Sequence, residues 1–366
     1  MPLRTVVSAS DAFADVESLW DDLLRRGTRQ PGFRVVRAGV TTPAKDVTRR
    51  AGIGNEDLAD MIAPNQVVAR YREGDTVVLQ GLHHTDRHLA KIANNLALAL
   101  DHPVQINGYF SPASARGLDL HFDYHDVFVV QLGGSKRWRI WEPIARTVDP
   151  VKGRHVIAKP RFEELAEPLL DLTLTAGDCL YLPRGYPHSA ETTDSASEHL
   201  TIGLVAITWQ RVIRKAVDAE VAAGRLSAAL PPGLLEPGSS SSAVAPDLSG
   251  LEAQLGPATL RHWMAREIWR RQPATRLRPR TIPELGPTSL TFGPGPLVWL
   301  TTIGDRAVLG LGDRVLDMPA EATDFLAALL DSEGPVAAGD LKGLDHASRA
   351  VVLRRLLAEG VLVHAG

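Results

Sequence analysis

The feature that most constrains the fold is a series of short apolar runs between residues 104 and 208. These runs are rich in β-branched and aromatic residues, and Gly, Pro and Ser residues separate them. Such a rhythm is typical of a β-sandwich or a jelly roll. The runs predict strands at Val104–Phe110, Asp119–Leu132, Arg137–Trp141, Leu172–Thr175, Asp178–Leu182 and His199–Thr208.

The segments before this β-rich region have mixed patterns. Apolar residues recur at helical spacing over 10–26 and 86–100, which predicts two helices. Short apolar runs over 66–71 and 76–80 predict strands.

The segments after the β-rich region predict helices over 210–226 and 251–271, joined by a Pro-, Gly- and Ser-rich flexible linker over 231–250. A distinct tail follows over 286–366. The tail predicts a strand pair over 297–310, helices over about 320–330, 337–343 and 346–359, and a last strand over 361–364, which together make a winged-helix shape. We therefore expect three parts, with bounds 1–210, 211–285 and 286–366.

The composition excludes several classes of protein. The chain has 366 residues, of which 44% are hydrophobic, and a net charge of −3. This charge argues against non-specific binding to nucleic acid or to acidic membranes. Cys179 is the one cysteine, so no intramolecular disulfide is possible, and this fits a cytoplasmic location. Neither a signal peptide nor a run of 18 apolar residues is visible, so no membrane association is expected.

Three residues of the β-rich region predict a metal site. His121 and Asp123 are two residues apart, so on a strand they point to the same side of the sheet. His188 follows a Gly177-Asp178 turn and a Pro-Arg-Gly corner, and we expect it to come from a neighbouring strand. Two imidazoles and one carboxylate form the ligand set of non-haem Fe(II) oxygenases, which leaves open positions on the metal. The alternatives are three ordinary polar residues, or a cupin of the storage or isomerase kind with another metal or none.

Lys136 is the candidate for binding an anion. A lysine in a β-rich core usually has an anionic partner or extends to solvent. In an iron oxygenase of this type, the partner would be the distal carboxylate of 2-oxoglutarate. Arg137 and Arg139 share one face of the strand, and Lys136 lies opposite with Trp138. Spacing alone does not decide which of Lys136, Arg137 and Arg139 binds the carboxylate. The alternative is that the three form a solvated basic edge of the sheet and bind no cosubstrate.

Four stretches together resemble the JmjC-type cupin oxygenases, specifically the ribosomal-oxygenase branch. They are Asn107–Pro112, His121–Arg139, Gly177–His188 and His199–Gly203, and the likeness covers roughly residues 65–210. The resemblance implies a mainly β catalytic core, a double-stranded β-helix or cupin jelly roll. An α-helical dimerisation region and a C-terminal winged-helix-like domain would follow.

The resemblance also implies Fe(II) and 2-oxoglutarate as cofactors. His121, Asp123 and His188 look like the iron ligands, and Lys136 looks like the residue that binds the 2-oxoglutarate C5 carboxylate. Asn107, Tyr109 and Thr201 are similar to residues that line the same pocket.

The implied activity is a 2-oxoglutarate-dependent dioxygenase that hydroxylates a protein side chain, with a ribosomal protein Arg or His as the first expectation. The protein would be a homodimer joined by the helices over 210–226 and 251–271. A ribosomally made peptide or a small-molecule natural product remains an alternative substrate. A catalytically silent JmjC-like binding module is a third possibility, and the intact ligand set argues against it.

Several other residues are candidates for a functional role. His125 would share the metal-facing side by strand parity, and His199 lies on the strand that returns past the pocket, so either is a candidate pocket residue. The adjacent His83 and His84 form a possible second metal site, although a solvated turn is the simpler interpretation. Cys179 is expected to be a small buried hydrophobe rather than a nucleophile.

The charge of the tail argues against DNA binding. From residue 286 on, ten acidic and six basic side chains give a net charge of −4. Duplex binding depends on neutralising phosphates, which an acidic module does poorly. We expect a structural or substrate-docking role instead.

Overall fold

The computed structural model divides into two compact units, Met1–Ala206 with Arg271–Pro273, and Ile207–Arg270 with Ala274–Gly366. The structure describes residues 3–6, 20, 27–143, 165–227, 229, 249–272, 289–292, 298–311, 314–332, 334–337, 339–340 and 342–364. The helix predicted over 10–26, Trp20 apart, lies outside these residues. So does the linker predicted over 231–250, except for residues 249 and 250, which are helical.

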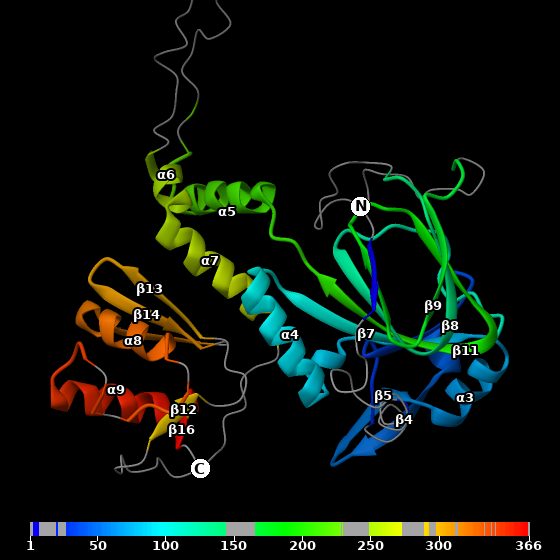
Figure 1. The fold of residues 1–366 in the computed structure, drawn as a ribbon, viewed down its shortest axis with the longest axis horizontal. Coiled ribbons are helices and arrows are strands. Elements are labelled where there is room, and N and C mark those ends of the chain that lie inside the picture. Colours follow the sequence, from blue (N-terminus) through cyan, green and yellow to red (C-terminus); the bar gives the residue numbers. More distant parts are fainter. Residues whose placement is uncertain are drawn as a thin grey trace, which may run out of the picture. The chain divides into compact units, whose positions relative to one another are not determined.

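Nine strands of the first unit form one sheet, which curls round on itself and is called the barrel here (Figure 1). Its strands run in the order β1-β10-β8-β11-β7-β6-β2-β3, and β9 pairs with β8. The strands are β1 (Leu3–Val6), β2 (Phe33–Arg37), β3 (Val40–Thr41), β6 (Thr76–Leu79), β7 (Val104–Ser111), β8 (Asp126–Ile140), β9 (Leu170–Thr175), β10 (Asp178–Leu182) and β11 (His188–Leu204).

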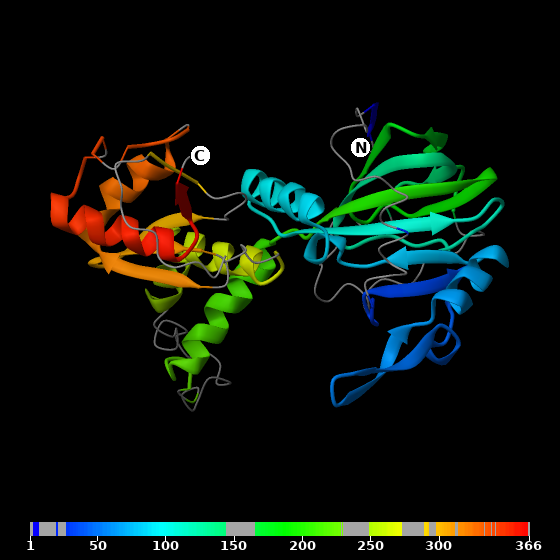
Figure 2. The same cartoon turned by 90° about the horizontal axis from the view of Figure 1, so that it is seen from below.

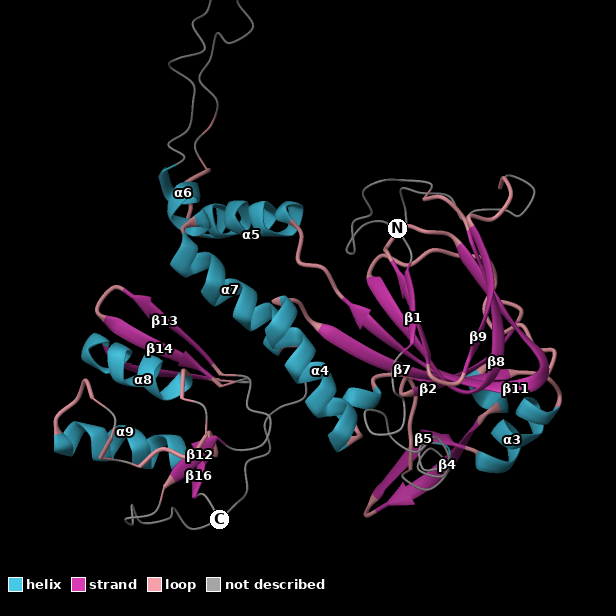
Figure 3. Ribbon diagram, in the orientation of Figure 1, coloured by secondary structure: helices cyan, strands magenta, loops and turns pink. Residues whose placement is uncertain are grey.

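The remaining elements of the first unit lie beside the barrel. A separate hairpin of β4 and β5 projects from it (Figure 2). These elements are β4 (Thr48–Ile53), β5 (Glu56–Ile62), α3 (Pro64–Arg72), α4 (Arg87–Leu100) and the short 3-10 turns at Ala44–Asp46 and Leu82–His84. Figure 3 shows that strands dominate this unit, so the predicted mainly β, cupin-like core is confirmed.

Strands β8 and β11 are long because each takes part in both halves of the barrel. The first half of β8 pairs with the second half of β11, and the second half of β8 pairs with the first half of β11. The register is irregular between Thr192 and Ser197. Gly134 lies opposite this irregularity with a φ of +63°, and a Cβ there would lie 1.7 Å from the carbonyl oxygen of Ala196. Only glycine fits such a position. The local bend therefore depends on Gly134.

The local sequence explains α4. The carboxylate of Asp86 accepts hydrogen bonds from the backbone N–H groups of His88 and Leu89, which caps the first turn. The helix buries Leu89, Ala93, Asn94 and Ala97 on one face. The helix predicted over 86–100 and the strand over 76–80 are confirmed.

Three predictions in this unit are wrong. Residues 66–71 belong to helix α3 rather than to a strand, since Pro64 occupies the first helical turn, a position that proline favours. Strand β8 begins at Asp126, so residues 119–125 form a loop whose one ladder contact is an isolated bridge from His121 to His188. The expected break at Gly133-Gly134 is also absent, because β8 continues through both residues.

The second unit holds helices and two small sheets. Helices α8 and α9 pack against the sheet β13-β14-β15 through buried residues that include Leu309, Phe325 and Leu353. The elements are α5 (Trp209–Ala222), α6 (Ser249–Leu255), α7 (Pro257–Trp269), β12 (Leu290–Phe292), β13 (Trp299–Ile303), β14 (Arg306–Gly310), β15 (Val315–Pro319), a 3-10 turn (Ala320–Ala322), α8 (Thr323–Leu330), α9 (His346–Ala358) and β16 (Leu362–His364).

The predictions for the second unit are partly correct. The strand pair β13 and β14, the helices α8 and α9, and the last strand are confirmed. The helix predicted over 251–271 is two helices, since Gly256 and Pro257 interrupt it. No helix forms over the described residues of 337–343. Within the described ranges, no helix has the length and apolar character that a membrane crossing requires.

Candidate metal centre

The structure brings His121, Asp123 and His188 together. One potential ligand atom from each lies within 4.8 Å of the other two. The Nε2 atom of His188 is 3.7 Å from Oδ2 of Asp123, and the two imidazole ring centroids are 4.3 Å apart. Among the described residues, this is the one group of three such side chains that could hold a metal ion.

Backbone pairing holds the three residues in place. The N–H groups of His121 and His188 each donate to the other's carbonyl, at 3.2 and 2.7 Å. The N–H of Gly185 donates to the carbonyl of Asp123 at 2.9 Å, which ties the loop to the Pro-Arg-Gly corner. Because Asp123 lies outside the ladder, this bond and not strand parity positions it.

Both imidazoles have the orientation that a metal ligand needs. Nδ1 of His121 lies 2.7 Å from the carbonyl oxygen of Asp119, and Nδ1 of His188 lies 3.0 Å from that of Tyr186. A carbonyl only accepts, so each Nδ1 carries the proton and each Nε2 offers a lone pair. Burial and the neighbouring imidazole of His121 lower the pKa of His188 to about 4, so its ring is neutral at pH 7. The donor set therefore fits a divalent metal.

The charges around Asp123 keep its carboxylate ionised. Burial raises its pKa, but the nearby His188, His121, His125 and Arg34 outweigh that effect and lower the pKa below its usual value. An ionised carboxylate is the form that binds a metal.

Lys136 faces the barrel interior, and its two basic neighbours face outward. Lys136 is 4% exposed, and its Nζ donates to the Ser111 hydroxyl at 3.0 Å. Arg137 makes a bidentate ion pair with Asp171, and Arg139 pairs with Glu191. None of the described carboxylates pairs with Lys136, and burial lowers its pKa to about 7. Its ammonium is therefore available for an anion.

The residues predicted to line the pocket share this interior. Asn107, Tyr109 and Ser111 alternate along β7, and Thr201 of β11 pairs with Asn107. Asn107 accepts a hydrogen bond from the N–H of Gly81 at 3.0 Å. The Tyr109 hydroxyl lies within hydrogen-bonding reach of Thr201 and Arg34, and burial and the charge of Asp123 raise its pKa.

His199 lies between aromatic rings deep in the same interior. Its ring stacks on Tyr109 at 4.7 Å and meets Trp138 edge-on at 5.7 Å. Burial and the charge of Lys136 hold the pKa of His199 well below its usual value, so the ring is neutral. Its buried Nδ1 has no hydrogen-bond partner among the described residues. The structure thus places His199 in the pocket region, as the sequence suggested.

The ring of His125, which precedes β8, packs against Gly203 of β11. A Cβ on Gly203 would lie 2.5 Å from Cδ2 of His125, so the ring occupies the space that a side chain at 203 would fill. Nε2 of His125 is 3.1 Å from Nε2 of Gln105, which fixes the ring. The absence of a side chain at Gly203 is what admits His125.

His83 is a structural residue rather than a ligand. Its Nδ1 accepts from the N–H of Ile106 at 3.1 Å, and its Nε2 donates to the carbonyl of Arg271 at 3.3 Å. With both ring nitrogens occupied, it has no lone pair for a metal, which argues against the second metal site considered for His83 and His84. Cys179 is buried, and burial raises the pKa of its thiol, as expected for a core residue.

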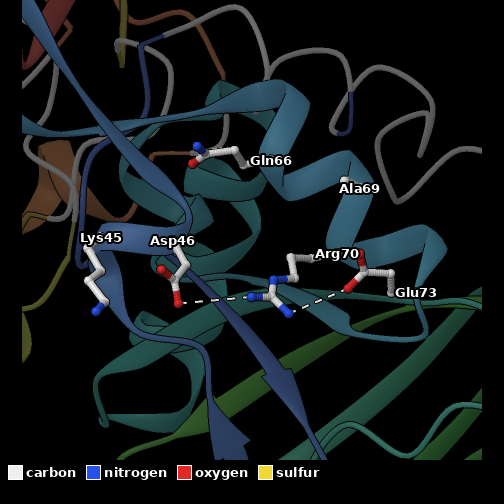
Figure 4. Close-up of a pocket in the computed structure, with 6 residues that line it drawn as sticks. All are labelled: Lys45, Asp46, Gln66, Ala69, Arg70 and Glu73. Atoms are coloured by element: carbon white, nitrogen blue, oxygen red, sulfur yellow. Dashed lines mark hydrogen bonds and ion pairs between the residues drawn. The ribbon is translucent and has the colours of Figure 1, made fainter.

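A second hollow lies away from the metal ligands. It encloses about 360 Å³ and is lined by Lys45, Asp46, Gln66, Ala69, Arg70 and Glu73. Arg70, its central cation, pairs with Asp46 and Glu73 at 3.9 and 3.4 Å (Figure 4). With these charges already paired, the hollow offers no evident chemistry.

Three further residues of this interior, Arg34, Thr76 and Ser111, have no distinctive sequence motif. Thr76 and Ser111 join their hydroxyls at 2.9 Å beside Lys136. Arg34 alternates with the buried Phe33 and Val35, which is the one sequence signal that sets it apart. All three lie on strands that pair with strands far away in the sequence, and this pairing decides which side of each strand faces the barrel interior.

Comparison with known proteins agrees with this geometry. The JmjC domain family matches residues 78–212. A "Bifunctional lysine-specific demethylase and histidyl-hydroxylase NO66" of Dictyostelium discoideum is 35% identical over 158 residues, which are 42% of this chain and 30% of that protein. A "Ribosomal oxygenase 1" of Danio rerio is 41% identical over 99 residues, 26% of this chain and 18% of that protein. The chain thus spans less than a third of these relatives.

A solved structure extends the likeness to the whole fold. The Escherichia coli ribosomal oxygenase YcfD, in complex with cobalt and 2-oxoglutarate, aligns with a TM-score of 0.59 and 19% identity. The alignment covers 100% of this chain and 95% of YcfD. The match to the JmjC domain family over residues 78–212 agrees with the resemblance seen in the sequence.

Proposed function

We propose that this protein is an Fe(II)- and 2-oxoglutarate-dependent dioxygenase that hydroxylates a protein side chain. The observation that carries the proposal is the pair of sites formed by the partly buried ligand set of His121, Asp123 and His188 and by the buried ammonium of Lys136. Together, iron and 2-oxoglutarate would supply the oxidising chemistry that turns a C–H bond into C–OH while 2-oxoglutarate becomes succinate and carbon dioxide.

The residues of this chain would bind and orient the two cofactors. His121 and His188 would hold the metal through Nε2, and Asp123 would neutralise part of its charge. Lys136, positioned by Ser111, would pair with the C5 carboxylate of 2-oxoglutarate. Asn107, Tyr109 and Thr201 would line the same pocket.

A ribosomal protein is the first candidate substrate, with Arg or His as the target residue. The support is that the relatives bear the names histidyl-hydroxylase and ribosomal oxygenase. The test compares intact masses of all ribosomal proteins from the source organism with and without this gene. Loss of one oxygen atom's mass from one protein in the deletion strain is expected, and a copy of the gene carrying Asp123→Ala should fail to restore it.

Unchanged masses would remove ribosomal proteins from the proposal and favour a ribosomally made peptide or a small-molecule natural product. Turnover of 2-oxoglutarate to succinate by the purified protein separates these enzymes from a silent binding module. Absence of such turnover with iron bound would contradict the enzymatic proposal itself.

We further propose that the protein is a cytoplasmic homodimer joined through its helical region, 211–285. Helix α5 exposes Trp209, Ile213 and Val221 at helical spacing, with 67%, 51% and 59% of each residue accessible. Apolar stripes of this kind mark interaction surfaces. Light scattering should give twice the mass of one chain, and Ile213→Glu should give a monomer. A wild-type monomer at micromolar concentration would contradict the proposal.

The tail, 286–366, would act as a winged-helix-like structural or substrate-docking domain rather than as a DNA-binding one. Its net charge of −4 supports this role.

A further inference from the structure

Arg34 lies on the interior face of the barrel. In the antiparallel ladder, Arg34 is opposite Val78, and Val78 is opposite Tyr109. Residues directly opposite each other share one face of a sheet, so Arg34 points to the side on which Tyr109 stacks on His199. The guanidinium is also within hydrogen-bonding reach of the Tyr109 hydroxyl.

Arg34 has no ion-pair partner among the described residues. Its Nε atom is buried and makes no hydrogen bond. Arg37 on the same strand pairs with Asp75, and Arg137 on β8 pairs with Asp171. A guanidinium stays charged at any ordinary pH, and leaving such a charge partly buried without a partner is costly. The position of Arg34 therefore calls for an anion that this part of the chain does not supply.

The charges that face the barrel interior do not balance. Arg34 and Lys136 bring two positive charges, and Asp123 brings one negative charge that belongs to the metal site. A bound divalent metal would widen the imbalance. A ligand with two carboxylates would reduce the excess positive charge, one carboxylate beside each cation.

The two cations lie at different places along the pocket. Lys136 contacts Ser111, and Arg34 contacts Tyr109, two residues away on the same face of β7. Two strand residues span roughly 6.5 Å, and a five-carbon dicarboxylate has a similar reach. Because Lys136 lies at the Ser111 end of this face, Arg34 would meet the opposite end of such a ligand.

We propose that Arg34 is a second cosubstrate-binding residue, which pairs with the carboxylate of the 2-oxo acid next to the metal while Tyr109 orients its guanidinium. The inference rests on the proposed function and deepens it. The pocket would then bind 2-oxoglutarate through one cation at each end, and it would discriminate against ligands that lack either carboxylate.

The test measures ligand affinity without turnover. Protein loaded with Mn(II) in the absence of oxygen is titrated calorimetrically with 2-oxoglutarate and with 2-oxopentanoate, which keeps the 2-oxo acid but lacks the distal carboxylate. Arg34→Met should weaken binding of both ligands at least tenfold, and Arg34→Lys should restore part of the loss. Lys136→Met should weaken 2-oxoglutarate and leave 2-oxopentanoate unchanged. The control Arg137→Gln removes an outward-facing arginine from the same barrel and should change neither affinity.

The outcomes separate the two ideas. Wild-type affinity for both ligands in Arg34→Met, with full Mn(II) content as the check on folding, would overturn the inference and leave the proposed function standing. A loss confined to 2-oxoglutarate would overturn the placement of Arg34 beside the metal. If the wild-type protein binds neither ligand, the proposed function fails and the inference falls with it.

Discussion

Replacing Lys136 by methionine should make the ligand-free protein more stable. Burial lowers the pKa of Lys136 from 10.5 to about 7, so at neutral pH the unfolded chain holds this proton more tightly than the folded one. At about 1.4 kcal/mol for each pKa unit, keeping the ammonium in the barrel costs up to roughly 4 kcal/mol at pH 7. Loss of the hydrogen bond to Ser111 returns about 1 kcal/mol, which leaves a net gain of about 3 kcal/mol.

The sign of the pH dependence follows from the same two pKa values. Between about pH 7 and 10.5 the unfolded chain binds more protons, so the stability of the wild type rises with pH. The advantage of the methionine variant should therefore be largest at pH 7 and should vanish near pH 10.5.

The difference in unfolding free energy between Lys136→Met and the wild type can be measured by hydrogen exchange in urea. Peptides from β8 and β11 are followed, because they report on the barrel alone. The measurement is repeated in Mn(II) with and without 2-oxoglutarate, which should add stability to the wild type and little to Lys136→Met. If Lys136→Met were equally destabilised at pH 7 and pH 10, Lys136 would not be an unpaired buried cation and the reasoning would fail.

Three further changes probe other parts of the first unit. His121→Ala removes one of three ligands and should reduce bound iron, measured by elemental analysis, to a small fraction of one per chain; full occupancy would contradict the ligand assignment. Burial lowers the pKa of His83 from 6.5 to about 4, so the unfolded chain binds more protons between these values, and about 3 kcal/mol of stability should be lost as pH falls through them. In urea unfolding, the stability of His83→Asn should not fall between pH 6.5 and 4 in this way. An unchanged pH dependence would show that His83 does not cause it. Gly203→Ala should cost about 1 to 3 kcal/mol by displacing His125, and much less in a His125→Ala background; equal costs in both would show that the two residues do not compete for space.

The residues of the candidate site lie in dense local motifs, and the structure brings His121, Asp123 and His188 together as the sequence predicted. Strand alternation was enough to orient Lys136 away from Arg137 and Arg139, and the structure confirms that arrangement. The spacing of His121 and Asp123 gave the right pair for a partly wrong reason. They lie in a loop that is positioned by His188 and Gly185 rather than in a strand.

The failures are of two physical kinds. Short apolar runs do not distinguish a strand from a helix, and at 66–71 the decisive residue was Pro64, just outside the run. The role of Arg34 depends on which strand lies beside β2. That pairing joins residues far apart in the chain, so no local pattern reveals it. The same limit hid the hydroxyl pair of Thr76 and Ser111.

The pairing of β8 with β11 along most of their length has a consequence for how the barrel folds. His121 and His188 meet only after these two strands, which are distant in sequence, have found their register. Contacts of such high sequence separation form late, because the entropy of loop closure must first be overcome. A metal ion would then find its ligands assembled only in chains that have completed the barrel. Metal uptake would therefore be the last step of folding rather than its nucleus, and its rate would report how fast the β8–β11 pairing forms.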